Sequence, residues 1–335
     1  MKYISILLIL VMAILFSSCN SCSPKKSGSE ESVKPKASIP VPTFNSDSAY
    51  QLVAEQVAFG PRVPNTKAHD KCAAFLIDKL KGGCKDVMIQ KGTVKAWNGA
   101  ILNFSNIIAS WKPGINNRIF LCAHWDSRPY ADHDTDPKNH RKPVDAANDG
   151  ASGVGILLEV ARQLSLSTPP IGVDIILFDV EDYGPPEDER NNLGNTEEFW
   201  GQGAQYWAKN PHVPDYYAKY GILLDMVGAR NATFLAEGFS MYYAPNIVKR
   251  VWETAGRIGY SNYFIYDNGP QITDDHVPIN RLKGIPTIDL IHLDKGSPTG
   301  FYPYWHTTKD NMASIDKATL QAVGQTLLTV IYEDQ

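Results

Sequence analysis

Carboxylate and imidazole side chains recur where apolar segments of this sequence end. Each of four apolar segments is followed by at least one such residue: His124, Glu181 with Asp182, Asp225, and His306. A fifth group, Asn148-Asp149-Gly150, stands directly before an apolar segment with helical periodicity. Carboxylates and imidazoles together suit a catalytic Zn²⁺, which takes three protein ligands and leaves one position open for water or substrate. A further carboxylate beside the metal can act as acid and base, so the joint pattern indicates a metalloenzyme.

Each of these residues also has an ordinary structural explanation when it is considered alone. An Asp before a helix is commonly an N-cap, an isolated His is commonly a hydrogen-bonded structural residue, and an acidic pair after a strand is commonly a solvated turn. The recurrence of such residues at the ends of several strands favours one shared site.

The apolar segments predict the elements that must position these side chains. Unbroken apolar runs such as 119–123 are typical of strands that are buried on both faces. Strands alternating with helices predict an α/β fold with helices on both faces of the sheet. In such a fold ligands bind outside the carboxyl ends of the strands, where these polar residues stand. Strands are expected over 87–94, 102–111, 118–124, 173–180, 220–227 and 286–293, and helices over 45–57, 68–80, 151–164, 197–209, 245–258 and 315–332.

The composition is that of an ordinary globular protein. Among 335 residues 43% are apolar and 20% are charged, and the formal net charge is −4. These values exclude collagen-like, wholly disordered and disulfide-knot proteins. The lack of a basic excess argues against nucleic acid as a partner. We expect one catalytic domain over residues 44–335, in a monomeric protein.

The first 43 residues have the character of a targeting segment and a tether. The apolar run Ile4–Phe16 is too short for a membrane span, which needs about 20 residues, but it suits the core of a signal peptide. The following Ser17-Ser18-Cys19 resembles a bacterial lipoprotein signal. We therefore expect a signal peptide over 1–18, acylation of Cys19 and a flexible tether over 19–43. This predicts an exported protein anchored to a bacterial membrane, on the periplasmic side or at the cell surface; a plain secretory signal and an uncleaved anchor are the alternatives.

Two other features have weaker chemical interpretations. Cys72 and Cys122 lie in apolar surroundings and are expected to be core thiols, and a Cys72–Cys84 disulfide stays open. The acidic segment 132–136 suggests a calcium loop, but prolines stand where an EF-hand needs its Gly and its bidentate Glu. We interpret this segment as a polar surface loop.

Six segments carry a resemblance to a known family. They are AHWDSRP (123–129), AANDGASGVGILLEVARQL (146–164), ILFDVEDYG (176–184), LLDMVGARNATF (223–234), DDHVPI (274–279) and PYWHTTKDN (303–311). Together they resemble the motifs of the zinc-dependent peptidases of the aminopeptidase type, family M28, and within that family the bacterial glutaminyl cyclases. The resemblance covers most of the chain from about residue 58 to 332. It implies a central mixed, mostly parallel β-sheet flanked by helices on both faces.

The resemblance also implies roles for individual residues at the metal. Asp149, Asp182 and His306 match the zinc ligands, and Glu181 matches the catalytic acid and base. His124, together with Asp225, matches positions that hold a second zinc in the peptidases.

Other residues match the surroundings of the catalytic Glu181. Asp225 and Asp274 would form a carboxylate network beside it. Trp305 marks the cyclases, where it lines the substrate pocket, and Trp200 would help to wall off the substrate from a neighbouring loop.

The chain departs from the cyclases of animals at three places. Asp182 stands where they have a second Glu, and 184–186 (Gly-Pro-Pro) stand where they have a Trp. Asp289 replaces a His in the strand that follows the DDHVPI segment. These differences fit a bacterial branch of the cyclases.

The implied reaction is the cyclisation of N-terminal glutamine in peptides and proteins to pyroglutamate, with release of ammonia. One Zn²⁺ would act as the Lewis acid. The first alternative is a two-zinc aminopeptidase that hydrolyses N-terminal residues, and the second is a surface binding protein that has kept the fold without catalysis.

Overall fold

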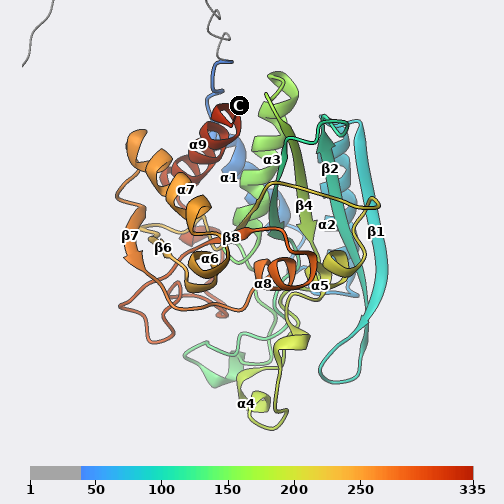
Figure 1. The fold of residues 1–335 in the computed structure, drawn as a ribbon. Helices are drawn as coiled ribbons and strands as arrows, with labels where there is room; N and C mark the ends of the chain where they lie inside the picture. Colours follow the sequence, from blue (N-terminus) through green and yellow to red (C-terminus); the bar gives the residue numbers. More distant parts are fainter. Residues whose placement is uncertain (1–38, 335) are drawn as a thin grey trace, which may run out of the picture. The chain divides into compact units, whose positions relative to one another are not determined.

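A six-stranded sheet forms the centre of the domain (Figure 1). Its strands lie in the order β1-β2-β4-β3-β5-β8. The pairs β4–β3, β3–β5 and β5–β8 are parallel, whereas β1–β2 and β2–β4 are antiparallel. The sheet is thus mixed and mostly parallel, as predicted. The strand bounds are β1 (Asp86–Lys95), β2 (Ile101–Trp111), β3 (Arg118–His124), β4 (Gly172–Phe178), β5 (Gly221–Asp225) and β8 (Thr287–Ile291).

The computed structural model describes residues 39–334, and residues from Ile39 onward form one unit. The predicted signal peptide over 1–18, Cys19 and most of the predicted tether lie outside the described residues. Within 39–334 no helix is long and apolar enough to cross a membrane.

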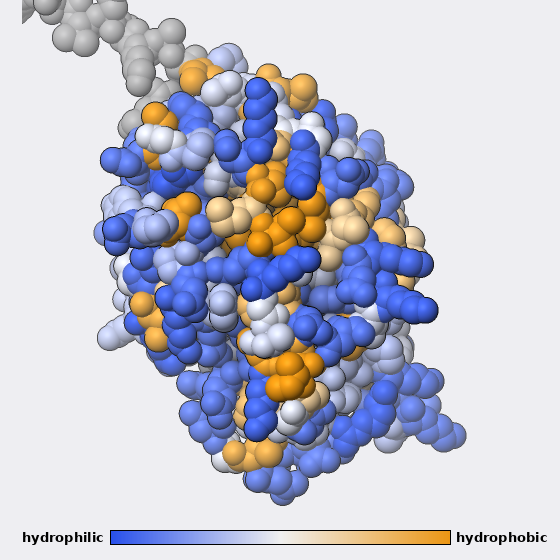
Figure 2. All heavy atoms as spheres, turned by 90° about the vertical axis from the view of Figure 1, so that its right-hand side faces the viewer, coloured by the Kyte–Doolittle hydropathy of each residue, from blue (hydrophilic) through white to orange (hydrophobic). Residues whose placement is uncertain are grey.

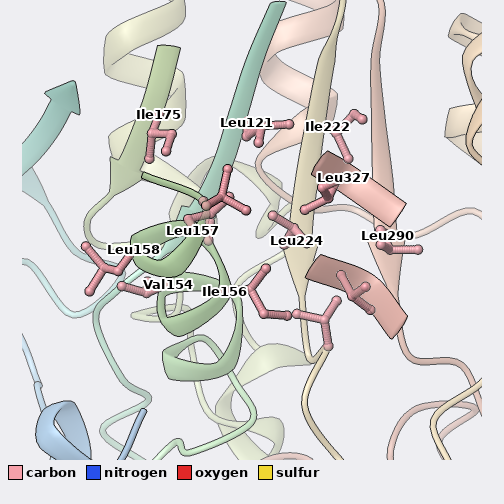
Figure 3. Close-up of a cluster of buried hydrophobic side chains, with 14 of the residues drawn as sticks. Leu121, Val154, Ile156, Leu157, Leu158, Ile175, Ile222, Leu224, Leu290 and Leu327 are labelled. Carbon is pink, nitrogen blue, oxygen red and sulfur yellow. The ribbon is translucent and has the colours of Figure 1, made fainter. Parts of the chain in front are cut away.

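Every residue of β3, β4, β5 and β8 is buried, because helices cover both faces of the sheet. Side chains alternate along each strand, so Leu121 and Leu224 point to one face whereas Phe120 and Leu223 point to the other. The first face packs against α1 (Ser46–Val57), α2 (Lys67–Lys81), α3 (Ala151–Leu166), α7 (Pro245–Arg257) and α9 (Lys317–Glu333). Figure 3 shows side chains of this layer, with Ile156 and Leu327 close to the strand residues Ile222 and Leu224.

The second face is covered by shorter elements. They are α5 (Gln202–Lys209), α6 (Gly238–Tyr243), α8 (His276–Pro278) and the π-helical turn Ile279–Lys283 (Figure 1). The small helix α4 (Glu187–Arg190) and 3₁₀ turns at Pro137–Asn139, Glu197–Phe199 and Met312–Ser314 lie in the connections.

Helix α3 lies so close to the sheet that it brings its N-terminus to the ends of two strands. A Cβ atom added at Gly153 would lie 2.5 Å from the carbonyl oxygen of Leu224 and 3.0 Å from the Cβ of Ala123. Only glycine fits at this contact. The close approach places Asp149, which precedes α3, next to the carboxyl ends of β3 and β5.

The structure differs from the predicted elements at several places, of which three concern the site strands, the helix before the site and the sheet. The strand expected over 173–180 ends at Phe178, because Val180 has a φ of +54°. The helix expected over 197–209 is broken before α5 by Gly201, whose φ is +57°. A two-stranded sheet of β6 (Phe234–Ala236) and β7 (Phe264–Asn268) was not predicted.

The edge strand β1 is open to solvent on the side shown in Figure 2, where hydrophilic residues predominate around a smaller apolar area. Met88 on β1 and Ile101 on β2 are among the exposed apolar residues of the domain. Lys91 and Lys95 are exposed on β1. Charged side chains on an edge strand oppose pairing with a second sheet.

The described cysteines are buried free thiols. Cys72 and Cys122 lie in the core as predicted, and Cys84 donates a hydrogen bond to the carbonyl oxygen of Ser110. Cys72 and Cys84 are therefore not joined by a disulfide in this structure.

Candidate metal centre and active site

The residues predicted to share a site converge at the carboxyl ends of the parallel strands. His124 ends β3, Asp225 ends β5, and Glu181 and Asp182 follow β4. His306 comes from the long connection between β8 and α9. One small cavity, of about 60 Å³, is lined by all of these except His124, and also by Asp149, Asp274, Trp200 and Trp305.

Asp149, Asp182 and His306 form a buried cluster with the spacing of a metal site. His306 Nε2 lies 3.2 Å from Asp182 Oδ1 and 3.6 Å from Asp149 Oδ2. The candidate ligand atoms all lie within 4.8 Å of one another. Ligand atoms about 2 Å from a tetrahedral zinc would lie roughly 3.3 Å apart, so the donor set and its spacing fit zinc.

A second cluster of the same kind shares Asp149. His124 Nε2 lies 3.0 Å from Asp149 Oδ1 and 3.3 Å from Asp225 Oδ1. His124, Asp149 and Asp225 also satisfy the spacing of a metal site. The two oxygens of Asp149 thus face different clusters, which leaves room for one cation or two.

The electrostatics of the site also favour a cation. Burial, followed by the neighbouring carboxylates, raises the pKa of Asp225 to about 6 and that of Asp274 to about 7. Burial and Asp274 together raise the pKa of Glu181 well above its ordinary value. Asp182 Oδ2 has no hydrogen-bond partner among the described residues. A divalent cation would offset this excess of buried negative charge.

Glu181 and Asp182 are held by a carboxylate that the sequence analysis did not assign to the site. Asp126 Oδ1 accepts a hydrogen bond of 3.0 Å from the Glu181 amide, and Asp126 Oδ2 accepts one of 3.2 Å from the Asp182 amide. Asp126 is the acidic residue of the AHWDSRP segment, and its place in that motif could have indicated that it belongs to the site. A similar contact involves Asp310, which accepts hydrogen bonds of 2.9 and 3.1 Å from the amides of Asn148 and Asp149.

The backbone is strained around the site. Val180, Met226 and His306 have φ values of +54°, +50° and +53°. Such values are uncommon for residues other than glycine, and for a β-branched residue they are outliers. These residues flank Glu181 and Asp225 or are themselves a candidate ligand, and strain of this kind costs on the order of 1–3 kcal/mol per residue.

Two indole rings flank His306. Trp305 stacks on the His306 ring at a centroid distance of 3.9 Å, and Trp200 lies parallel to it at 6.3 Å. A Cβ at Gly184 would overlap the Trp200 ring. Gly184 belongs to the Gly-Pro-Pro segment, so the absence of a side chain there leaves the space that Trp200 occupies.

The interpretation of the segment 132–136 as a surface loop was right for Thr135 and Asp136, which are exposed, and wrong for Asp132 and Asp134, which are each only 7% exposed. Asp132 is paired with the buried Arg128. Asp134 accepts hydrogen bonds from the amide and the hydroxyl group of Thr308. The side chains of Asp132 and Asp134 therefore connect loops inside the protein, whereas Asp136 is exposed.

Asp289, which replaces a His of the animal cyclases, lies buried on β8. Both of its carboxylate oxygens are without a hydrogen-bond partner in the described range. His276 Nδ1 lies 3.9 Å from Asp289 Oδ2. Burial, followed by the nearby carboxylate of Asp274, raises the pKa of Asp289 well above its ordinary value.

Comparison with known proteins places the chain in a family. The model of the family described as "Peptidase family M28" matches residues 106–331, and the chain belongs to this family. A solved structure of Bacteroides thetaiotaomicron glutaminyl cyclase bound to N-acetylhistamine is 52% identical with a TM-score of 0.86, over 88% of this chain and 100% of that chain.

Two further similarities bear on function. A Zn-dependent exopeptidase from Parabacteroides distasonis is 54% identical with a TM-score of 0.86, over 88% of this chain and 100% of that one. The curated glutaminyl-peptide cyclotransferase of Gloydius blomhoffii is 28% identical over 258 residues, which are 69% of this chain. The match spans 65% of the length of that relative.

Proposed function

We propose that this protein is a glutaminyl-peptide cyclotransferase, which converts N-terminal glutamine of peptides and proteins to pyroglutamate and releases ammonia. The observation that carries the proposal is the position of Glu181, which lines the same small cavity as the Asp149, Asp182 and His306 cluster and the two indole rings. The similarity to a bacterial glutaminyl cyclase over nearly the whole domain supports it.

Asp149, Asp182 and His306 would hold one zinc ion. Zinc bound there would supply Lewis-acid polarisation of the glutamine side-chain carbonyl.

Glu181 carries out both proton transfers. The α-amine of the peptide is the nucleophile, and holding it near the side-chain carbonyl makes the attack effectively unimolecular. Glu181 takes a proton from this amine and delivers it to the departing amide nitrogen, which leaves as ammonia. Asp225 and Asp274, which line the same cavity, orient Glu181 and the amine. Trp200 and Trp305 exclude water from the glutamine side chain.

A Glu181→Gln variant tests this assignment. We expect it to bind zinc normally and to release no measurable ammonia from a peptide with N-terminal glutamine, because only the proton transfer is removed. His306→Ala should lose the metal as well as the activity. Cyclisation by Glu181→Gln at the wild-type rate would refute the role of Glu181.

A two-zinc aminopeptidase is the second candidate, and the cluster of His124, Asp149 and Asp225 favours it. This enzyme would release free amino acids rather than ammonia. Two zinc ions per chain, together with hydrolysis of peptides that lack N-terminal glutamine, would decide for the aminopeptidase.

We also propose that Cys19 is acylated and anchors the protein to a bacterial membrane, on the periplasmic side or at the cell surface. Two or more acyl chains hold a protein stably on a membrane. Radiolabelled palmitate should label the wild-type protein and should not label Cys19→Ala in the cells of origin.

A further inference from the structure

A buried ion pair lies directly behind the candidate zinc ligands and has no part in the reaction described above. Arg128 Nε donates to Asp132 Oδ1 at 2.9 Å, and Arg128 Nη2 donates to Asp132 Oδ2 at 2.6 Å. The two side chains are 0% and 3% exposed. Burying two charges is costly unless their geometry is good. The contacts that Arg128 and Asp132 make with neighbouring residues therefore indicate what this ion pair does.

Asp132 faces the side of His306 that points away from the cluster. Asp132 Oδ1 lies 3.5 Å from His306 Nδ1. This nitrogen is buried and has no hydrogen-bond partner in the part of the chain that the structure describes. The amide of His133 donates to the carbonyl oxygen of His306 at 3.1 Å, so the same loop holds both the backbone and the ring of His306.

Arg128 contacts the other ligand segment. Its Nη1 donates to the carbonyl oxygen of Asp182 at 3.2 Å and lies 3.5 Å from Asp182 Oδ1. Nη1 also donates to the carbonyl oxygen of Gly184 at 3.3 Å, and Nη2 donates to that of Pro185 at 3.2 Å. The guanidinium carbon lies 4.8 Å from the centre of the Trp200 ring. One side chain thus connects Asp132, the Asp182 segment and an indole of the pocket.

The charge of Arg128 decides between two interpretations of Asp132. Asp132, His133 and His306 have a spacing that could hold a metal ion of their own. The bidentate guanidinium already neutralises the Asp132 carboxylate, and it would repel a second cation at the same oxygens. Asp132 is instead suited to accept a hydrogen bond from the ring N–H of His306, since a ligating histidine usually donates its other N–H to a carboxylate, carbonyl or water.

We propose that Asp132 is a positioning residue for His306, and that Arg128 fixes Asp132 relative to Asp182. Asp132 keeps the proton of the His306 ring on Nδ1 and leaves Nε2 free to face Asp149 and Asp182. This inference rests on the metal site of the proposed function.

Zinc affinity of the full-length protein, measured by competition with a chromophoric chelator, tests the proposal without any reading of activity. We expect Asp132→Asn to bind zinc 10- to 100-fold more weakly than the wild type, the usual effect of losing such a partner. The visible absorption bands of the cobalt-loaded protein should also shift, because the orientation of His306 changes. Asp132→Glu, which keeps the carboxylate, should recover most of the affinity.

A matched control exists at the opposite end of the same strands. Asp174 on β4 accepts two hydrogen bonds of 2.8 Å from Arg118 on β3, and this pair is also buried. Asp174→Asn should destabilise the fold and leave zinc affinity within twofold of the wild type. Arg128→Lys serves as the second variant if Asp132→Asn does not fold, and it should also weaken zinc binding.

The outcomes separate this inference from the proposed function. The positioning role would be overturned if Asp132→Asn bound zinc within twofold of the wild-type affinity, even if the wild type cyclises glutamine. The same result in Arg128→Lys would overturn it where that variant is needed. An equal loss of affinity in Asp174→Asn would overturn it too. A wild type that binds zinc but forms no pyroglutamate would overturn the proposed activity, while weaker zinc binding by Asp132→Asn would still support the positioning role.

Discussion

The replacement Glu237→Gln should destabilise the domain and the wall of the active-site cavity in a pH-dependent way. Glu237 is fully buried at the start of α6, and donors surround its carboxylate. Oε1 accepts from the amides of Phe239 and Ile272 at 2.7 and 2.8 Å. Oε2 accepts from the amide and the hydroxyl group of Ser240 at 2.6 and 2.7 Å. Whichever way a glutamine is turned in this place, its amide N–H₂ group faces at least one backbone N–H, of Phe239 and Ile272 or of Ser240, and the hydrogen bond from that N–H is lost.

The magnitude follows from the pKa of Glu237. Burial alone would raise this pKa, but His276 and the surrounding donors outweigh it and lower the pKa from 4.5 to about 2. A pKa that falls from 4.5 in the unfolded chain to about 2 in the folded protein corresponds to about 3 kcal/mol of folding free energy. Because the pKa is lower in the folded state, this stability is fully present above pH 4.5 and is lost as the pH falls toward 2. The difference between wild type and Glu237→Gln should therefore be about 3 kcal/mol at pH 7 and should shrink below pH 4.5.

Urea denaturation followed by circular dichroism at pH 7, 4 and 3 measures this difference. Glu253→Gln on α7 is the matched control, because the Glu253 side chain is 60% exposed and lies 3.8 Å from Lys249. It should change the free energy of unfolding by less than about 0.5 kcal/mol at every pH. A Glu237→Gln variant as stable as this control at pH 7, or a difference that stays constant down to pH 3, would refute the reasoning. Since Ile272 lines the cavity, we also expect a higher KM at pH 7.

Three further perturbations test the site and its scaffold. Gly184→Ala should raise KM at least several-fold with little loss of stability, because its Cβ would overlap the Trp200 ring. Gly256→Ala is the control and should leave KM unchanged, because a Cβ has open space there. Equal KM values for the two variants would contradict this role of Gly184. Removal of the metal by a chelator should abolish ammonia release and lower the melting temperature, because free zinc at 1,000 times its Kd stabilises the folded state by about 4 kcal/mol. A melting temperature that is insensitive to added zinc would argue against zinc binding by the folded protein. Gly153→Val should prevent α3 from approaching Leu224 and lower the free energy of unfolding by more than about 3 kcal/mol through overpacking. Soluble protein of wild-type stability would show that this contact can relax.

The sequence predicted best those features that local patterns determine. Strand β3 has its predicted bounds, 118–124, because its central residues 119–123 are an unbroken apolar run and the polar Arg118 and His124 mark its two ends. Asn45 caps α1 as its position before an amphipathic segment indicated. The break at Gly201 was missed, because a glycine within a helical pattern only permits a left-handed backbone, and whether the chain adopts it depends on tertiary packing.

In the site, too, the residues at motif positions were predicted and those with contacts distant in sequence were not. Asp149, Asp182 and His306 stand at motif positions, so their convergence could be expected, and the structure brings them together. Asp132 and Asp134 were misplaced because an acidic segment between prolines looks like a solvated loop. Their burial depends on Arg128 and Thr308, and Thr308 is distant in sequence from Asp134. Arg128 is only four residues from Asp132, but the contact of Asp134 with Thr308 is set by tertiary structure, and no local pattern shows it.

The left-handed backbone at Val180, Met226 and His306 has a consequence for directed evolution of this protein. Glycine or asparagine would adopt these dihedral angles at lower cost than valine or methionine. Both side chains are buried, at 0% and 1% exposure, and truncation of a large core side chain costs about 2–5 kcal/mol through the cavity that it leaves. This cost exceeds the strain that glycine would relieve, so selection for survival of heat should retain Val180 and Met226. The unusual backbone beside Glu181 and Asp225 should then persist through such selection, because side-chain packing outweighs backbone preference at both positions.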